Sequence, residues 1–167
     1  REMLPTTIDE VEQSFAKAKN LNSALKNFLK REGTANPQAA AFAKDFRAVA
    51  GSGKSAAIRA FLERNYPKRE IFFVGLARYA HPELVESTVG KIIDTHADAF
   101  NSTYERGEGD ISIKDSAAFK KIVKDVEKLI DQGLASAELP SSNFMKNTLL
   151  ASVFEPDVLG EVLKALK

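Results

Sequence analysis

Residues 71–77 have the sequence Ile-Phe-Phe-Val-Gly-Leu-Ala, and this longest dense apolar run of the chain decides the fold class. A run of this length fits either a buried strand or a buried helix. No second strong strand candidate exists to pair with it, and an isolated strand is unstable. We therefore expect these residues to lie in a buried helix and the chain to be all-α. The run stops at Arg78, far short of the roughly 20 residues that span a bilayer, so we expect no membrane span.

Apolar residues recur at helical spacing on both sides of this run. The clearest stripes are Phe42, Phe46 and Val49 before it, Val85, Val89, Ile92, Ile93 and Phe100 after it, and Phe119, Ile122, Val123, Val126, Leu129, Ile130 and Leu134 further on. Thr7 and Glu10 have the spacing of a capping box, which predicts a helix start. Pro67 disfavours helical geometry in the residue before it, so we expect a helix to end there. The pattern predicts about eight helices in a compact bundle or a short stack of helical hairpins.

The composition is that of an ordinary globular protein, with 44% apolar and 28% charged residues in 167 positions. This length predicts a single helical domain over residues 1–167. The chain has no Cys, which excludes a disulfide scaffold, a thiolate metal site and a Cys nucleophile. Residues 1–20 contain no apolar signal segment. The chain begins at Arg1 rather than Met, which predicts a processed product or a piece of a longer chain. We expect a soluble protein, cytoplasmic or secreted without disulfides.

A weak internal repeat is visible. Residues 76–85 resemble residues 150–159, with identical Leu, Ala and Pro at matching positions. This similarity predicts an internal duplication of about 38–93 and 115–166, joined by a loop over 101–115, as in α-solenoids. The alternative is chance, because any two amphipathic helices joined by a Pro-acid turn look alike.

Charge is unevenly distributed along the chain. Residues 1–80 contain 14 Lys and Arg against 8 Asp and Glu, whereas residues 81–167 contain 10 against 15. Such polarity steers a charged partner or favours head-to-tail self-association. The basic residues of the first half that could form one stripe for nucleic acid are Lys17, Lys19, Lys26, Lys30, Arg31, Lys44, Arg47, Lys54, Arg59, Arg64, Lys68 and Arg69. No recognisable nucleic-acid-binding motif accompanies them.

The segment 51–55, Gly-Ser-Gly-Lys-Ser, resembles the end of a phosphate-binding P-loop. The first glycine of that motif would fall at Ala48, and a helical stripe precedes the segment where a P-loop has a strand. We therefore expect a joint between two helices. A smaller role remains open for Ser52, Gly53, Lys54 and Ser55, which could bind one anion at a helix N-terminus.

The two histidines are the other polar candidates. His96 falls on the stripe of Val89, Ile92 and Ile93, which favours a hydrogen-bonded core residue. The alternative is a general base at a pocket, with Glu83 or Glu86 approaching. His81 is expected to cap the helix that starts at Pro82.

The function that these patterns favour is a non-catalytic protein–protein interaction module presenting a helical groove or a charged face. No cofactor or metal motif is present in the sequence. The alternatives are a nucleic-acid-binding protein that uses the basic N-terminal half, an enzyme with a His/carboxylate site near His96, and an anion or nucleotide binder at residues 51–55. A protein partner is expected, and homo-oligomer formation stays open.

Overall fold

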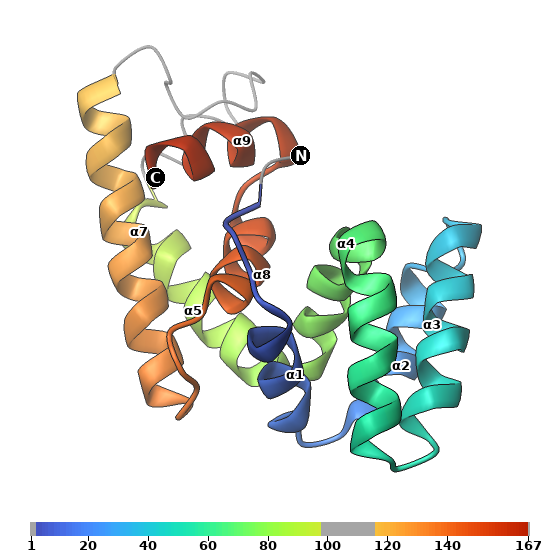
Figure 1. The fold of residues 1–167 in the computed structure, drawn as a ribbon. Helices are drawn as coiled ribbons and strands as arrows, with labels where there is room; N and C mark the ends of the chain where they lie inside the picture. The colour runs from blue at the N-terminus through green and yellow to red at the C-terminus, as the bar shows by residue number, and fades with distance from the viewer. Residues whose placement is uncertain (1–2, 98–115, 167) are drawn as a thin grey trace. The chain divides into compact units, whose positions relative to one another are not determined.

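The computed structural model describes residues 3–97 and 116–166, and every element in these ranges is a helix. The all-α prediction is confirmed. The helices, labelled as in Figure 1, are α1 (Ile8–Ala16), α2 (Leu21–Arg31), α3 (Pro37–Ala50), α4 (Ser55–Ala80), α5 (Pro82–Thr95), α7 (Ser116–Ser136), α8 (Asn143–Val153) and α9 (Pro156–Ala165). None of them is long and apolar enough to cross a membrane.

The helices form two compact units, and the chain passes from one to the other more than once. One unit contains Pro5–Pro82 and Ser142–Thr148, and the other contains Arg1–Leu4, Glu83–Ser141 and Leu149–Lys167. The first has 14 Lys and Arg against 7 Asp and Glu, a net charge of +7, and is called the basic unit. The described residues of the second have 6 against 10, a net charge of −4, and form the acidic unit. The first residues of α8 belong to the basic unit and the rest to the acidic unit.

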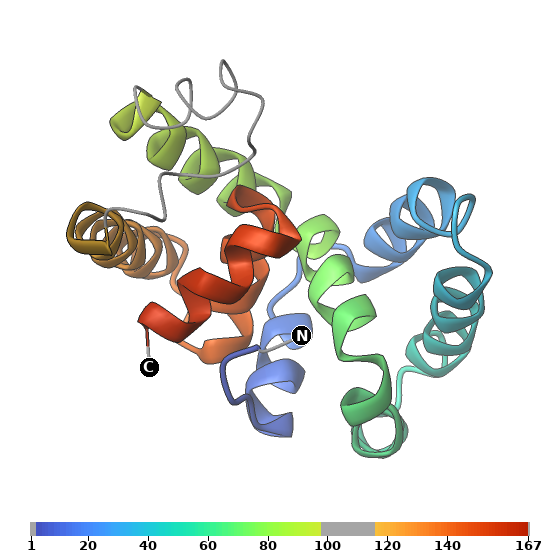
Figure 2. The same cartoon turned by 90° about the horizontal axis from the view of Figure 1, so that it is seen from above.

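The basic unit is built around buried aromatic rings. Figures 1 and 2 show α2, α3 and α4 side by side, with α3 and α4 running antiparallel from a tight turn. Phe73 of α4 lies at the centre and is fully buried. Its ring centroid lies within 4.8–6.4 Å of those of Phe15, Phe42, Phe46, Phe61 and Tyr66. The apolar run that decided the fold class therefore supplies the centre of this core.

Sequence signals at the helix starts are also confirmed. Thr7 caps α1 by accepting a hydrogen bond from the amide of Glu10, as the capping box predicts. Asn36 caps α3 in the same way, with Pro37 at the first helical position. These caps satisfy amide groups that a helix otherwise leaves without partners.

The helix predicted to end before Pro67 continues past that residue and breaks at Arg69, so the expected break is present but comes two residues after the proline. α4 runs through Pro67 to Ala80 and changes direction at Arg69, whose φ of −121° and ψ of 26° are not helical. A proline inside a helix removes one backbone hydrogen bond and bends the axis, without requiring that the chain stop. The second half of α4 continues because Phe73, Val74, Leu76 and Ala77 are buried there.

The acidic unit has α5 and α7 packed antiparallel. The evidence is a pair of contacts, Thr88 against Gly133 and His96 with Asp125. His96 follows Thr88 by eight residues, directly after the last residue of α5, and Asp125 precedes Gly133 by eight residues on α7, so the two helices run antiparallel. α9 also packs on α7.

The predicted repeat is not tested by these helices. Both similar segments form helix–Pro–helix joints, α4 to α5 at Pro82 and α8 to α9 at Pro156. The boundaries of the two units do not coincide with the proposed copies, 38–93 and 115–166. The loop predicted over 101–115, and Phe100 of the predicted apolar stripe, lie outside the described residues.

Candidate functional site

The turn between α3 and α4 and the first residue of α4 hold the four residues predicted to bind an anion. Gly53 has φ of +69°, a left-handed conformation that glycine adopts without steric cost. Ser52 Oγ donates to the carbonyl oxygen of Val49 at 2.6 Å and accepts from the amide of Lys54 at 3.3 Å. The turn is therefore an ordered joint between two helices. A P-loop would need a strand where α3 lies.

The first turn of α4 is compatible with the predicted binding of one anion at a helix N-terminus. Ser52, Gly53, Lys54 and Ser55 are all exposed. Lys54 is the N-cap residue of α4, and its side chain makes no capping hydrogen bond. Helix amides at such a position attract anions. The anion site stays a prediction.

His81 is the C-cap residue of α4 and lies in a partly buried contact of the basic unit. Its Nε2 donates to the backbone carbonyl oxygen of Ser14 in α1 at 2.9 Å, so Nε2 carries the hydrogen. Ser14 Oγ lies 3.4 Å from the same nitrogen and donates to Met145 Sδ of α8 at 3.0 Å. His81 therefore joins the end of α4 to α1, and Ser14 continues the contact to α8. Burial lowers the pKa of His81, and the hydrogen bond to Ser14 opposes this shift in part.

The lowered pKa of His81 predicts that the basic unit loses stability in mild acid. A lowered pKa in the folded chain means that the unfolded chain, with an ordinary histidine pKa of about 6.5, binds the proton first. The free energy of unfolding should therefore be unaffected by His81 above about pH 6.5 and fall as the pH drops below it. The H81Q variant keeps an amide donor but does not titrate, so its unfolding should depend less on pH. Urea unfolding of H81Q and of the unmodified chain at a series of pH values from about 7.5 to 5.5 measures this. An unchanged pH dependence in H81Q would contradict the prediction.

His96 makes a different contact, within the acidic unit. Its Nε2 lies 2.7 Å from Asp125 Oδ2 of α7, and its side chain is 14% exposed. The pair joins the end of α5 to α7. It agrees with the prediction of a hydrogen-bonded histidine on an apolar stripe, and Ile92 on that stripe is fully buried.

Glu83 does not approach His96. The two lie at opposite ends of α5, about 20 Å apart at a rise of 1.5 Å per residue. The carboxylate next to His96 is that of Asp125, and not that of Glu83 or Glu86 as the alternative prediction had it. His81 belongs to the basic unit, so the structure brings none of the three predicted polar residues, His96, His81 and Glu83, into contact within one unit.

One buried polar cluster of the basic unit was missed from the sequence. Tyr66 of α4 is 5% exposed, and burial raises its pKa to about 12, opposed in part by the nearby side chain of Thr6. The charges of Glu70 and Glu10 raise it further. Asn147 of α8 donates to Thr6 Oγ1 at 3.4 Å. The phenol of Tyr66 thus stays protonated at neutral pH and can donate a hydrogen bond but cannot act as a base. No spacing rule connects residues 6, 66 and 147, because only the fold brings them together.

Within the part of the chain that the structure describes, no group of three His, Asp or Glu side chains could hold a metal ion. A comparison with protein-family profiles finds no match, and searches of curated proteins and of solved structures likewise find none. The function is therefore inferred from the residues of this chain.

Proposed function

We propose that the chain is a non-catalytic protein–protein interaction module whose basic unit docks an acidic surface of a partner protein. The supporting observation is the separation of charge between the two units, +7 in the basic unit and −4 in the described part of the acidic unit. Separated charge of this kind steers oppositely charged partners and raises their association rate.

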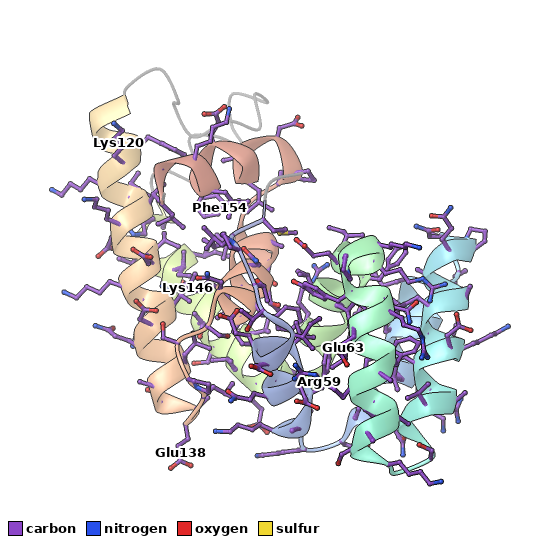
Figure 3. All side chains as sticks on the ribbon, viewed as in Figure 1. Arg59, Glu63, Lys120, Glu138, Lys146 and Phe154 are labelled. Atoms are coloured by element: carbon purple, nitrogen blue, oxygen red, sulfur yellow. The ribbon has the colours of Figure 1, made fainter. Side chains whose placement is uncertain are left out.

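The excess charge of the basic unit lies on α2, α3 and α4. The exposed residues that carry it are Lys26, Lys30, Arg31, Lys44, Arg47, Lys54, Arg64 and Lys68. Among the described residues, no carboxylate forms an ion pair with any of them. Other cations of this unit are neutralised internally. Arg59 pairs with Asp9, Glu12 and Glu63, close to Glu63 in Figure 3, and Arg69 pairs with Asp45 at 3.0 Å.

The alternative partner, nucleic acid, receives less support from the same unit. Proteins that bind single strands stack bases on exposed aromatic rings. Here the aromatic rings of the basic unit are buried in its core, apart from the partly exposed Phe72 and Tyr79. Tyr79 is already engaged, donating to Glu32 at 2.7 Å. A protein partner with a carboxylate-rich surface needs only the exposed cations.

Among the described residues, the His96–Asp125 pair is the contact that most favours the alternative of an enzyme. A carboxylate that orients a histidine is a common part of general-base sites. The same pair also explains how α5 and α7 are joined, and no nucleophile is recorded in contact with it among the described residues. We therefore interpret it as a structural contact.

A binding experiment with a charge-reversed variant tests the proposal. The probe is a fluorescein-labelled polyglutamate peptide of about 15 residues, measured by anisotropy at about 50 mM and about 300 mM salt, since salt screens such contacts. We expect K26E/K30E/K44E to weaken binding at low salt about tenfold or more. The matched control is K120E/K124E/K128E on α7, which changes the net charge equally, and Figure 3 labels the first of these positions.

The outcomes separate the alternatives. Equal weakening in both variants would mean that net charge alone controls binding and would overturn the proposal that the basic unit docks the partner. Tighter binding of a single-stranded or duplex oligonucleotide than of the peptide, by about tenfold or more and lost in K26E/K30E/K44E, would replace the protein partner with nucleic acid.

A further inference from the structure

One arginine of the basic unit has a guanidinium group that no carboxylate of the described residues neutralises. Arg78 lies in the last turn of α4, well after the break at Arg69. Its Nε atom is buried and has no hydrogen-bond partner. The residue as a whole is partly exposed, and it forms no ion pair within the described part of the chain. An unpaired cation that is partly withdrawn from water is unfavourable unless something outside the chain supplies its partner.

Packing holds this guanidinium group against α4. Gly75 lies three residues before Arg78 on the same helix and is buried. A Cβ added at Gly75 would lie 3.3 Å from Phe28 Cε2 of α2 and 3.7 Å from Arg78 Nη2. The lack of a side chain at position 75 therefore leaves room for both the ring and the guanidinium group. Arg78 thus has less conformational freedom to lose on binding than a fully exposed lysine has.

A second unpaired arginine lies close to the same place. Arg31 is the last residue of α2, is exposed, and forms no ion pair with a carboxylate of the described residues. Burial and the hydrogen bond to Glu32 raise the pKa of Tyr79, whereas the charges of Arg78 and Arg31 lower it. Both charges therefore act on one hydroxyl group, where the end of α2 meets α4.

A carboxylate is also near, but a tyrosine engages it. Glu32 is the C-cap residue of α2, and its Oε2 accepts a hydrogen bond from the Tyr79 hydroxyl at 2.7 Å. The ring of Tyr79 is packed edge-on against that of Phe28, 6.0 Å centroid to centroid. Glu32 alone does not neutralise two guanidinium groups, so an excess of positive charge remains here. We call Arg31 and Arg78 the arginine pair.

We propose that the arginine pair anchors an acidic segment of the partner protein, with Arg78 binding the carboxylate of one Glu or Asp side chain and Arg31 adding positive charge beside it. This inference rests on the proposed function, because it names the residues of the basic unit that bind the acidic partner. A planar guanidinium group can donate two parallel hydrogen bonds to a carboxylate, which an ammonium group cannot do.

Arg78 should contribute more to binding than the fully exposed cations of the same unit. A solvated lysine gives up its water and its rotamer freedom when it pairs, which is why ion pairs at the surface add little. The Nε of Arg78 is already out of water, and packing already confines the guanidinium group. A carboxylate that binds Arg78 therefore meets a smaller opposing free energy. Arginine is enriched among the few interface residues that carry most of the binding energy.

The labelled polyglutamate peptide tests this site with single substitutions at about 50 mM salt. We expect R78Q to weaken binding about fivefold or more. The matched control is R47Q on α3, since Arg47 is exposed, forms no ion pair among the described residues and loses the same charge. R47Q should weaken binding about twofold or less. R78K keeps the charge without the planar fork and should not restore the affinity of the unmodified chain.

A second measurement observes the guanidinium groups directly. The Nε–Hε signals of the arginines are followed in proton–nitrogen NMR correlation spectra of the full chain, while sodium acetate replaces sodium chloride at constant ionic strength. The signal that is absent in R78K belongs to Arg78 and should move saturably with acetate. The signal of Arg47, identified with R47Q, should stay in place. Circular dichroism checks that the variants remain folded, and the acetate response is measured on the unmodified chain in any case.

The outcomes separate this inference from the proposed function. Equal weakening by R78Q and R47Q, unchanged binding in R78K, or an acetate response of Arg78 no larger than that of Arg47 overturns the inference. If polyglutamate binding is nevertheless lost in K26E/K30E/K44E, the proposed function stands without it. Absence of polyglutamate binding overturns the proposed function, and the acetate response then decides separately whether Arg78 binds a carboxylate.

Discussion

Replacing Phe73 with alanine is expected to lower the free energy of unfolding of the basic unit by about 4 kcal/mol. Phe73 is fully buried, and five aromatic rings lie within 6.4 Å of its own, centroid to centroid. The loss combines the transfer of an aromatic side chain with the cavity that the rigid neighbouring rings cannot fill. Since these rings come from α1, α3 and α4, the cavity would loosen the packing of three helices at once.

The adjacent Phe72 provides a matched control for this variant. It is only partly buried, and its ring contacts that of Phe42, 5.7 Å away centroid to centroid. F72A should therefore lower the free energy of unfolding by much less, about 1–2 kcal/mol. Urea unfolding followed by circular dichroism and by tyrosine fluorescence measures both, and Tyr66 and Tyr79 report on the basic unit. Equal losses in F72A and F73A would show that the aromatic cluster is not the centre of the core.

Replacing Gly133 with alanine is expected to destabilise the acidic unit by about 2–3 kcal/mol, although alanine is the better helix former. A Cβ at position 133 would overlap Thr88 Oγ1 and would also press against the Cβ and the methyl group of Thr88. Thr88 is buried, and a β-branched side chain in a helix has little freedom to move away. The two helices would have to separate, so the clash outweighs the gain of about 1 kcal/mol in helix propensity.

Two further variants isolate this clash. G160A in α9 should stabilise the chain by about 0.5–1 kcal/mol, because a Cβ there meets nothing within 4 Å. The double variant T88A/G133A should recover most of the stability that G133A loses, because it removes the Oγ1 and the methyl group of Thr88 with which the new Cβ clashes. Thermal unfolding followed by circular dichroism compares the four proteins. If G133A were as stabilising as G160A, α5 and α7 would not pack as closely as the structure shows.

The sequence predicted which segments become helices, because each buried face repeats at helical spacing. The stripe from Phe119 to Leu134 on α7 is an example, with Val123, Val126, Ile130 and Leu134 fully buried. Residues 71–77 were correctly predicted to be helical, because the sequence offers no second strand with which they could pair. The helix break predicted before Pro67 lies two residues later, at Arg69, and a helix resumes after it because the residues that follow are buried.

Contacts between distant residues could not be predicted in this way. His96 pairs with Asp125, 29 residues away, and His81 contacts Ser14, 67 residues away. Helical spacing identifies the side of each helix that is buried but not the helix that covers it. The Thr88–Gly133 approach is of the same kind, since either residue alone is unremarkable in a helix.

The discontinuous course of the basic unit has a consequence for synthesis of the protein on the ribosome. Its core includes Phe144, whose ring lies 5.8 Å from Phe15 and 6.1 Å from Tyr66. The nascent chain supplies Phe144 only after Glu83–Ser141 of the other unit has been made. The first 82 residues therefore emerge with one side of their aromatic core uncovered. A cut within the intervening segment would not release an independent half, since each unit retains a part of the chain from both sides of the cut.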